Sequence, residues 1–407
     1  MDISHLSKIQ EVLDESVKKG VQAGVNCLCW KDGQEQAYFE SGLRDVENGV
    51  KFSRDTIVRC YSMSKPVTGV AVMKLLESGK IDLYDEVSEY LPAFKNMTCM
   101  KNGKVEKCTR PLIIQDLLNM TSGISYGGDN DEAHQHISKL IYCDGGLNQS
   151  AAGANNITTR QVADRIAEGP LSFEPGTDYE YGMSADVLGA VIEVVTGMKF
   201  SEYLKKNIWE PLGMKDTAFW VPEEKQNRLA KVYKSSQGQA AGAWGGNSKG
   251  GQMDLFTNCN LGIQDSMKME PAFESGGAGL VSTVDDYMRF VQMLSNKGTL
   301  DGQRILKEET VKYMSRAKLR PNLQQCFDWK MEHWSGYSYA NLCRVCIDPG
   351  SARAITVKGE FGWDGWLGTY MSVDIVNNLA IAYMTQKVDA GKTCTTRRVK
   401  NIIYTSL

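Results

Sequence analysis

Ser62-Met63-Ser64-Lys65 is the most informative stretch of this sequence. It follows segment 56–61 and precedes segment 67–76, whose residues are mostly apolar, so we expect a buried helix to begin here. At the first turn of such a helix, Lys65 shares a face with Ser62, and unpaired backbone N–H groups favour a developing anion. Burial lowers the pKa of a lysine, and a neutral amine can then accept the serine proton. The stretch therefore predicts a nucleophile, Ser62, beside its base, Lys65.

Two other segments, 16–19 and 315–318, have the same Ser-x-x-Lys spacing. Ser16 falls in an amphipathic helix expected near the N-terminus, and we expect it on the solvent-exposed face of that helix. Ser315 lies in a polar stretch rich in basic residues. Because this spacing commonly arises from a serine N-cap followed by a surface lysine, only the apolar flanks of Ser62 favour a catalytic pair.

The composition indicates an ordinary globular protein. The 407 residues are 42% hydrophobic and 23% charged, enough for one large core or two lobes that share an interface. A formal net charge of -3 and the lack of a basic stripe give no reason to expect nucleic acid or an anionic membrane as partner. No run approaches the roughly 18 apolar residues of a membrane span, and residues 1–20 lack the apolar centre of a signal peptide. We therefore expect a cytoplasmic protein.

The cysteine and histidine patterns predict neither a metal nor a cofactor. Eleven cysteines without regular spacing fit a reducing compartment, although Cys99 and Cys108, across a short Lys/Gly loop, could pair in a disulfide. Cys343-Arg344-Val345-Cys346 has the spacing of half a zinc site, but no second half follows and the four histidines are scattered. No phosphate loop or dinucleotide fingerprint is present.

Strand and helix patterns predict an α+β fold. Two β-hairpins are expected near the ends of the chain, and a closing helix follows the second one. The simplest architecture pairs the terminal strands in one antiparallel sheet, with the terminal helices packed against it. The predicted strands are residues 24–30 and 36–41 around Asp32-Gly33, and 368–375 and 379–385 around Asn377-Asn378; the closing helix covers 395–404.

The middle of the chain, residues 66–295, is predicted to be mainly helical. We expect one domain over residues 1–407, in which 1–65 and 296–407 form the sheet lobe and 66–295 forms the helical lobe. Loops rich in Gly, Asn and Ser interrupt the helices, and those over 126–156 and 237–257 are expected to frame a substrate pocket.

Ser62-Met63-Ser64-Lys65-Pro66-Val67-Thr68 resembles the first motif of the serine β-lactamase and penicillin-binding-protein superfamily, particularly its class C β-lactamase and family VIII carboxylesterase branch. The resemblance covers roughly residues 5 to 400 and implies a β-lactamase/transpeptidase-like fold with the active site between a sheet lobe and a helical lobe. Further segments resemble that family's signposts in the expected order: Asn119-Met120-Thr121-Ser122-Gly123, Phe173-Glu174-Pro175-Gly176, Glu210-Pro211-Leu212-Gly213-Met214-Lys215-Asp216-Thr217, Gly276-Gly277-Ala278-Gly279-Leu280, Ser282-Thr283-Val284-Asp285-Asp286 and Gly298-Thr299-Leu300-Asp301-Gly302.

The resemblance also implies roles for two later motifs. The second motif begins with a tyrosine, which makes Tyr181 in Glu180-Tyr181-Gly182-Met183-Ser184 the candidate that shares a proton with Lys65; Tyr179 is a rival two residues away. The third, Trp-x-Gly, matches Trp363-Asp364-Gly365-Trp366. There Gly365 would let substrate approach, and the backbone N–H of Trp366 would join that of Ser62 in an oxyanion hole worth about 3–4 kcal/mol per donor. Trp363 and Trp366 could instead be core aromatics.

Departures from the family pattern bear on the substrate. Where β-lactamases usually offer an Asn and a Lys-Thr pair, this chain has Met183, Trp363 and Asp364. The Asp364 carboxylate would repel the carboxylate of a β-lactam, so weak or no β-lactamase activity is expected. Trp363, Trp366 and Met183 would make the cleft apolar, which suits small neutral acyl esters. Asp364 could also contact an amine on the substrate, turn aside into solvent, or pair with an arginine such as Arg353.

These residues together predict a carboxylesterase-like serine hydrolase that acts through an acyl-enzyme on Ser62, with a small-molecule acyl substrate and water as the default acceptor. Three alternatives stay open: a class C-like β-lactamase or D-amino-acid amidase or peptidase, an acyltransferase, and a non-catalytic penicillin-recognising binding protein. Turnover distinguishes the last of these from an enzyme. The sequence does not indicate an oligomeric state.

Overall fold

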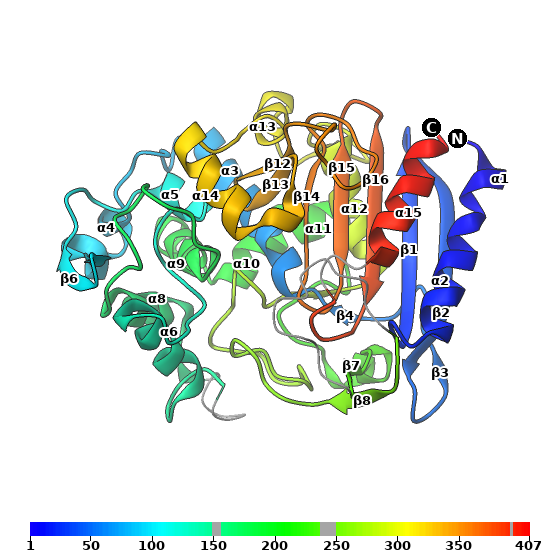
Figure 1. Ribbon diagram of the computed structural model, residues 1–407, viewed down its shortest axis with the longest axis horizontal. Coiled ribbons are helices and arrows are strands. Elements are labelled where there is room, and N and C mark those ends of the chain that lie inside the picture. Colours follow the sequence, from blue (N-terminus) through cyan, green and yellow to red (C-terminus); the bar gives the residue numbers. More distant parts are fainter. Residues whose placement is uncertain (149–155, 237–249, 391–393) are drawn as a thin grey trace.

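A large antiparallel sheet organises the protein (Figure 1). The computed structural model describes residues 1–148, 156–236, 250–390 and 394–407. Within these residues the largest sheet has eight strands in the order β12-β13-β14-β15-β16-β1-β2-β3. In chain order these are β1 Gly24–Lys31, β2 Gln34–Asp45, β3 Val50–Lys51, β12 Tyr337–Ala340, β13 Cys343–Cys346, β14 Phe361–Asp364, β15 Tyr370–Asp374 and β16 Leu379–Thr385.

The strands from the two ends of the chain lie next to each other. β1 pairs with β16 from Val25 opposite Thr385 to Lys31 opposite Leu379. Tight turns close the two predicted hairpins, and Asp32 and Asn378 take the left-handed backbone conformation that such turns require (φ 52° for both). The predicted hairpins and the pairing of terminal strands are therefore confirmed.

Terminal helices cover one face of this sheet. α2 (Lys8–Lys18) and α15 (Cys394–Thr405) lie side by side over it, with α1 (Ile3–Leu6) beside them (Figure 1). The two ends of the chain meet, because the backbone N–H of Asp2 donates to the carbonyl of Ser406 (2.8 Å). The apolar residues of the helices and strands form one buried cluster here: Leu6, Ile9, Leu13, Val25, Cys27, Cys29, Tyr370, Leu379, Ile381, Tyr383, Val399, Ile403 and Tyr404.

The opposite face of the sheet carries α12 (Val284–Ser295), which contacts β1, β15 and β16. Residues 284–295 were predicted to end the helical lobe. In the structure they form α12, which packs on the sheet instead. α3 (Ser64–Glu77) lies between α9 (Ser184–Thr196) and the strands β13 and β14. Nearly every residue of α3 is buried, as predicted from its apolar composition. α3 thus carries its N-terminus to the junction of sheet and helices.

The remaining elements surround this junction (Figure 1). Among the described residues, no helix combines the length and apolar character needed to cross a bilayer. The other helices are α4 Val87–Tyr90, α5 Ile114–Leu118, α6 Glu132–Tyr142, α8 Thr159–Ala167, α10 Phe200–Leu204, α11 Glu210–Leu212, α13 Glu308–Met314 and α14 Pro321–Lys330. Short antiparallel pairs join β4 Val58–Arg59 with β9 Val281–Ser282, β5 Thr98–Lys101 with β6 Lys104–Lys107, β7 Val232–Ser235 with β8 Met253–Phe256, and β10 Thr299–Leu300 with β11 Gln303–Arg304.

Candidate active site

Ser62 lies in a one-turn 3-10 helix, Tyr61–Met63, immediately before α3. The sequence predicted Ser62 within the first turn of the helix, whereas α3 begins at Ser64. Tyr61 has φ 45°, a left-handed conformation that costs about 1–3 kcal/mol in a residue other than glycine. Its ring is buried and packs edge-on against Trp366, with the centroids 5.0 Å apart. Packing therefore holds the turn that presents Ser62.

Lys65 is fully buried and meets Ser62 directly. Its Nζ lies 3.2 Å from Ser62 Oγ and donates hydrogen bonds to Tyr126 Oη (2.8 Å) and to the carbonyl of Gly277 (2.9 Å). Burial lowers the pKa of Lys65 to about 7, although nearby carboxylates oppose this shift. A substantial fraction of the amine is thus neutral near neutral pH and able to accept the Ser62 proton.

Tyr181 completes the cluster. Its Oη accepts a hydrogen bond from Trp363 Nε1 (2.8 Å), and its side chain also hydrogen-bonds Ser62. The Nζ of Lys65 lies 4.6 Å from the centre of the Tyr181 ring. Burial raises the pKa of Tyr181, so that its phenol keeps its proton at neutral pH. A protonated phenol between serine and lysine can relay a proton to a leaving group.

Tyr179, the rival tyrosine, points into the core instead. Its ring packs edge-on against Phe327 (5.1 Å between centroids) and Tyr339 (5.6 Å). Among the described residues, its hydroxyl has no hydrogen-bond partner. The geometry therefore favours Tyr181 over Tyr179 as the partner of Lys65.

Tyr126 is a site residue that the sequence did not single out. Its hydroxyl is bound by Lys65, and its ring meets that of Tyr181 edge-on, 5.6 Å between centroids. Burial raises the pKa of Tyr126 well above its usual value, so its phenol is also protonated. The nearest sequence signal is the signpost Asn119-Met120-Thr121-Ser122-Gly123, which ends three residues upstream but does not name a side chain.

The third motif ends strand β14 and turns beside Ser62. A Cβ on Gly365 would lie 2.2 Å from Thr369 Oγ1 and 2.4 Å from the carbonyl oxygen of Cys60. A glycine is thus required here so that the turn after β14 can pack against the residues that precede Ser62. This packing is a second reason for glycine, in addition to the predicted approach of substrate.

Trp366 occupies the same turn. Its indole Nε1 donates to Asp389 Oδ1 (2.6 Å), and its carbonyl accepts from the backbone N–H of Ala390 (3.1 Å). Together with the contact between the rings of Trp366 and Tyr61, these bonds fix the Trp366 peptide close to the Ser62 turn. Its predicted role as an oxyanion donor stays a prediction.

Comparison with known protein families gives a match over nearly the whole chain. Residues 9–402 match the Beta-lactamase family. The chain belongs to the beta-lactamase family.

Three relatives of this beta-lactamase family member cover nearly its whole length. Protein Rv1367c of Mycobacterium tuberculosis is 29% identical over 392 residues, covering 93% of this chain and 88% of the relative. Esterase EstB of Burkholderia gladioli is 26% identical over 390 residues, covering 95% and 91%. The solved structure of EstCE1, described as a hydrolase with promiscuous acyltransferase activity, superposes with a TM-score of 0.81 at 24% identity and covers 99% of both chains. The α+β, β-lactamase/transpeptidase-like fold is therefore confirmed.

Asp364, the last residue of β14, is buried. Only 6% of its surface is exposed, so the alternative in which it turns into solvent is wrong. Burial raises the pKa of Asp364 to about 7, opposed by the charges of Arg344 and Lys65. Its Oδ1 has no hydrogen-bond partner among the described residues. Arg344, in the neighbouring strand β13, is thus the arginine whose charge acts on Asp364. The suggested pairing of Asp364 with Arg353 has no support.

Met183 is also buried, with 1% of its surface exposed, and it precedes the first residue of α9. It therefore offers a substrate almost no surface, and its predicted contact with substrate stays a prediction. Ser184 is the first residue of α9, and its Oγ lies 2.8 Å from that of Ser122.

The other two Ser-x-x-Lys segments have different surroundings. Ser16 was expected to face solvent, but it is only 5% exposed and its Oγ donates to the carbonyl of Leu13 (2.7 Å), so that expectation was wrong. Ser315 is 3% exposed and its Oγ donates to the carbonyl of Lys312 (2.9 Å). Both hydroxyls thus donate to carbonyl groups of their own helices. Of the three Ser-x-x-Lys segments, the one at Ser62 has a serine hydroxyl in contact with a buried lysine.

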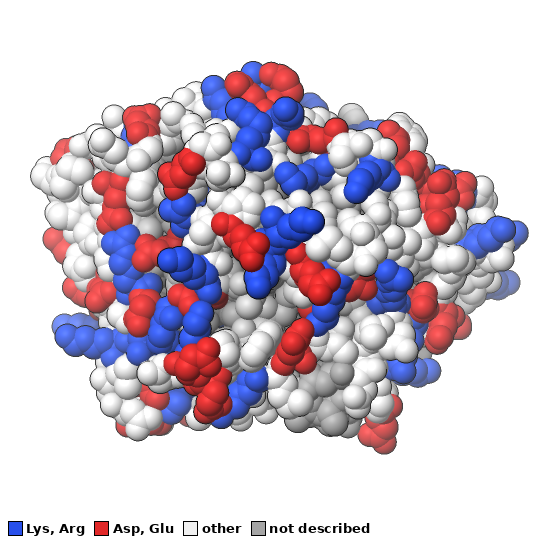
Figure 2. All heavy atoms as spheres, turned by 180° about the vertical axis from the view of Figure 1, so that it is seen from behind, with Lys and Arg blue, Asp and Glu red and all other residues white. Residues whose placement is uncertain are grey.

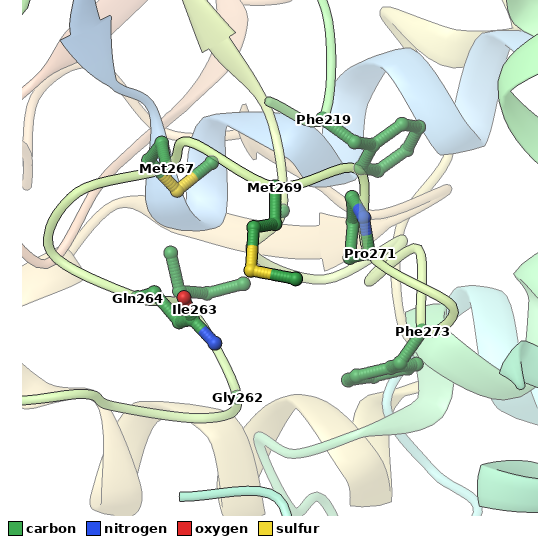
Figure 3. A pocket seen from close by; sticks show the side chains of 9 residues that line it. Phe219, Gly262, Ile263, Gln264, Met267, Met269, Pro271 and Phe273 are labelled. Carbon is green, nitrogen blue, oxygen red and sulfur yellow. The ribbon is translucent and has the colours of Figure 1, made fainter. Parts of the chain in front are cut away.

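Parts of the predicted substrate loops, residues 149–155 and 237–249, lie outside the described residues. A nearby apolar pocket is lined by Phe219, Gly262, Ile263, Gln264, Met267, Met269, Pro271, Phe273 and Gly279 (Figure 3). Its cavity of about 20 Å³ holds about one water molecule, which is too small for an acyl chain. On the face of the molecule seen in Figure 2, acidic and basic side chains are interspersed.

Proposed function

We propose that this protein is a serine hydrolase that cleaves small neutral acyl esters through an acyl-enzyme on Ser62. The observation that carries the proposal is the buried Lys65 amine, 3.2 Å from Ser62 Oγ. A relative that aligns with 95% of the chain, EstB, is named an esterase.

The described contacts suggest the order of proton transfers. Neutral Lys65 takes the hydroxyl proton as Ser62 Oγ bonds to the ester carbonyl carbon. The carbonyl oxygen becomes an anion that the backbone N–H groups of Ser62 and Trp366 stabilise. When the bond to the leaving alkoxide breaks, Tyr181 protonates that oxygen and regains a proton from Lys65. Water then attacks the acyl-enzyme by the reverse sequence, and Ser62 regains its proton.

The surroundings of Ser62 favour neutral esters over β-lactams. The positions that usually hold a polar amide and a lysine in β-lactamases carry Met183 and Trp363 here. On the resemblance, the neighbouring Asp364 stands at the position that meets the carboxylate of a β-lactam; it is buried, and like charges repel in a low-dielectric site. We therefore expect ester turnover to exceed β-lactam turnover by a wide margin.

Hydrolysis of p-nitrophenyl acetate and butyrate by wild type, Ser62→Ala and Ser315→Ala tests the proposal, with nitrocefin assayed in parallel. Ser315→Ala is the matched control because it removes a buried hydroxyl from the same Ser-x-x-Lys spacing. We expect Ser62→Ala to lose at least about 10³-fold in kcat and Ser315→Ala to retain activity. Ester turnover that survives in Ser62→Ala would exclude this nucleophile. Neither turnover nor a burst in wild type would favour a binding protein, and fast nitrocefin cleavage would favour a β-lactamase.

Acyl transfer is a second candidate, because an acyl-enzyme can react with an alcohol as well as with water. The structural relative EstCE1 is described as a hydrolase with promiscuous acyltransferase activity. Adding a primary alcohol to the ester assay would yield a new ester if the acyl group is transferred, and only the free acid if it is not.

A cytoplasmic location is part of the proposal. All eleven cysteines are free thiols, which suits a reducing compartment.

A further inference from the structure

A loop from the helical lobe supplies the third partner of Lys65. The carbonyl of Gly277 accepts a hydrogen bond from Lys65 Nζ (2.9 Å). The same loop is tied to α3, because Thr68 Oγ1 donates to the carbonyl of Gly276 (2.7 Å) and Ser64 Oγ accepts from the backbone N–H of Leu280 (3.0 Å). The position of this loop therefore determines where the lysine amine can sit.

Asp186, on the first turn of α9, holds the loop from the other side. Its Oδ1 accepts hydrogen bonds from Ser275 Oγ (2.5 Å) and from the backbone N–H of Gly277 (3.1 Å). Ser275 Oγ in turn accepts from the backbone N–H of Ala278 (2.9 Å). Asp186 is 2% exposed, so these bonds are not shared with solvent. Gly277 is thus held by Asp186 at its N–H and by Lys65 at its carbonyl.

The space around Gly277 brings Asp186 close to the rest of the site. A Cβ at Gly277 would lie 2.8 Å from Asp186 Oδ2 and 3.2 Å from Tyr126 Oη. The second carboxylate oxygen of Asp186 and the phenol bound by Lys65 therefore flank the same glycine.

We propose that Asp186 is a positioning residue for the acyl-transfer reaction. It anchors the Gly277 carbonyl that orients Lys65 towards Ser62, and it places a negative charge beneath the lysine amine. Among the described hydrogen bonds, none joins the Asp186 side chain to Ser62. The proposal rests on the function proposed above, in which Lys65 is the base.

The charge of Asp186 has a defined effect on Lys65. Among the described residues, the charged and titratable groups around the amine are Asp186 from α9, Asp364 from β14 and the phenols of Tyr126 and Tyr181. Burial lowers the pKa of Lys65, and the negative charges of Asp186 and Asp364 raise it. Lys65 in turn opposes the rise in the pKa of Asp186 that burial causes. Removing the Asp186 charge must therefore lower the pKa of Lys65.

Two substitutions separate geometry from charge. Asp186→Asn keeps an oxygen that accepts from Ser275 and Gly277 but removes the charge, whereas Asp186→Ala removes both. Asp286→Asn is the matched control. Asp286 is a buried carboxylate on the first turn of α12 that likewise accepts a loop N–H, from Asp216 (2.5 Å), and a hydroxyl, from Thr217 (3.2 Å).

The measurements are the pH dependence of kcat/KM on p-nitrophenyl butyrate and an NMR titration of the labelled Lys65 side chain, with thermal unfolding to confirm folding. We expect Asp186→Asn to move the acidic limb of the profile and the Lys65 titration to lower pH. We expect Asp186→Ala to lose in addition about ten- to a hundredfold in kcat. An unmoved Lys65 titration in folded Asp186→Asn, or an equal shift in Asp286→Asn, would overturn the proposal. The NMR titration reads Lys65 without turnover, so absent ester hydrolysis would count against the proposed function and not against the role of Asp186.

A second, independent feature is a pair of thiols on the β5–β6 hairpin. The Sγ atoms of Cys99 and Cys108 and a carboxylate oxygen of Glu174 all lie within 4.8 Å of one another. Cys99 is fully buried, whereas Cys108 is partly exposed and extends the hairpin ladder, its N–H donating to the carbonyl of Met97 (3.0 Å).

The surroundings of Glu174 do not suit a metal ion. Lys101 Nζ lies 2.7 Å from Glu174 Oε2, and Oε1 already accepts from the backbone N–H groups of Thr109 (2.7 Å) and Arg110 (3.1 Å). A cation would have to displace the lysine ammonium from this carboxylate. The thiols are therefore better placed to react with each other than to share a metal.

We infer that Cys99 and Cys108 are a site of reversible oxidation by small-molecule disulfides. The partly exposed Cys108 thiol loses its proton and attacks glutathione disulfide, forming a mixed disulfide and releasing one glutathione thiol; burial raises the pKa of Cys108, so this step is slow near neutral pH and faster in alkaline buffer. Cys99 then attacks the Cys108 sulfur and releases the second glutathione thiol. Two protein thiols are oxidised and one glutathione disulfide is reduced, so the exchange balances.

Incubation with glutathione disulfide, followed by mass spectrometry of peptides, tests this site. Cys143 is the matched control because it is exposed, and none of the described hydrogen bonds involves its thiol. We expect Cys108 to end in a disulfide with Cys99 and to carry no glutathione, while Cys143 keeps its adduct. In Cys99→Ser, we expect Cys108 to keep glutathione. An adduct that persists on Cys108 in the wild type, or protection of both thiols by stoichiometric zinc, would overturn the inference.

Discussion

Tyr126 Oη lies 2.8 Å from Lys65 Nζ, closer than the hydroxyl of Ser62 at 3.2 Å. The lysine amine thus donates to the phenol of Tyr126, which comes from a loop outside the three motifs. Tyr181, from the second motif, contacts the same amine with the face of its ring. Because burial raises the pKa of both phenols, neither competes with Lys65 as a base near neutral pH.

Tyr126→Phe tests the contribution of this contact. The change keeps the ring but removes the acceptor, and a buried hydrogen bond contributes about 1 kcal/mol. We expect kcat/KM to fall about fivefold, with the unfolding temperature close to that of wild type. Tyr339→Phe is the control, because Tyr339 is a buried tyrosine of the same aromatic cluster whose hydroxyl has no partner among the described residues. Equal activities of the two variants would contradict a role for Tyr126.

The pH profile reports the state of Lys65. With a pKa of about 7, the amine is neutral above pH 7 and protonated below it, so kcat/KM should fall as the pH drops through about 7. Because Asp364 also has a pKa of about 7, the limb describes the coupled pair. Asp364→Asn removes a charge that raises the lysine pKa and should move the limb to lower pH. A limb that stays in place would show that Asp364 does not act on Lys65.

Space around Gly277 gives a prediction about a single methyl group. In Gly277→Ala, the new Cβ would lie 2.8 Å from Asp186 Oδ2 and 3.2 Å from Tyr126 Oη. This crowding must move the Asp186 carboxylate and the Tyr126 phenol away from residue 277. We expect ester turnover to fall by about a hundredfold. Gly189→Ala in α9 is the control, because its nearest neighbours would lie 3.5 Å away, which is ordinary contact, and alanine favours a helix. Unchanged turnover in Gly277→Ala would contradict the prediction, because it would show that the loop can move without displacing the Lys65 amine.

A buried ion cluster under the active-site sheet predicts a stability effect. Glu360 binds Arg344 Nη2 (2.9 Å) and Lys400 Nζ (2.9 Å) in the interior between the sheet and α15. Glu360→Gln leaves two buried cations without their shared carboxylate and should destabilise the protein by about 3–5 kcal/mol. Glu309→Gln breaks a solvent-exposed pair with Lys312 and should change the denaturation midpoint little.

The same cluster sets an acid limit. Burial raises the pKa of Glu360, but Lys400 and Arg344 outweigh it and hold the pKa at about 2, below the ordinary value of 4.5. A depressed folded-state pKa contributes stability that is present above the unfolded-state pKa and is lost as the pH falls towards 2. Denaturant titrations at decreasing pH should therefore show wild type losing stability between about pH 4.5 and pH 2, and Glu360→Gln losing less over that range. Parallel losses in both proteins would contradict this assignment.

Elements with local signals could be predicted from the sequence. Asp32-Gly33 and Asn377-Asn378 mark hairpins because few residues adopt a left-handed conformation easily, and both turns form where expected. The pattern Thr158-Thr159-Arg160-Gln161 likewise predicts a capping box, and this capping box forms at the start of α8. The contact between Ser62 and Lys65 follows from spacing, since residues three apart on a helical turn share a face.

Residues with no local signal could not be predicted. The periodicity of its helix places Ser16 at a surface position, yet Ser16 is buried. Gln22 covers it, and Gln22 Nε2 donates to Ser16 Oγ (2.8 Å). Tyr126 and Asp186 reach the Lys65 amine from 61 and 121 positions along the chain, the first directly and the second through the Gly277 loop. No short-range pattern encodes such contacts.

The sequence by itself determined the family, the order of the terminal strands and the serine and lysine of the candidate site, because each is written in contiguous residues. Only the tertiary structure decided which groups surround Lys65 and therefore the pKa of its amine. Desolvation and charge depend on what is packed within a few ångströms of an atom, and those neighbours come from α9, β14 and two loops that only the fold brings together.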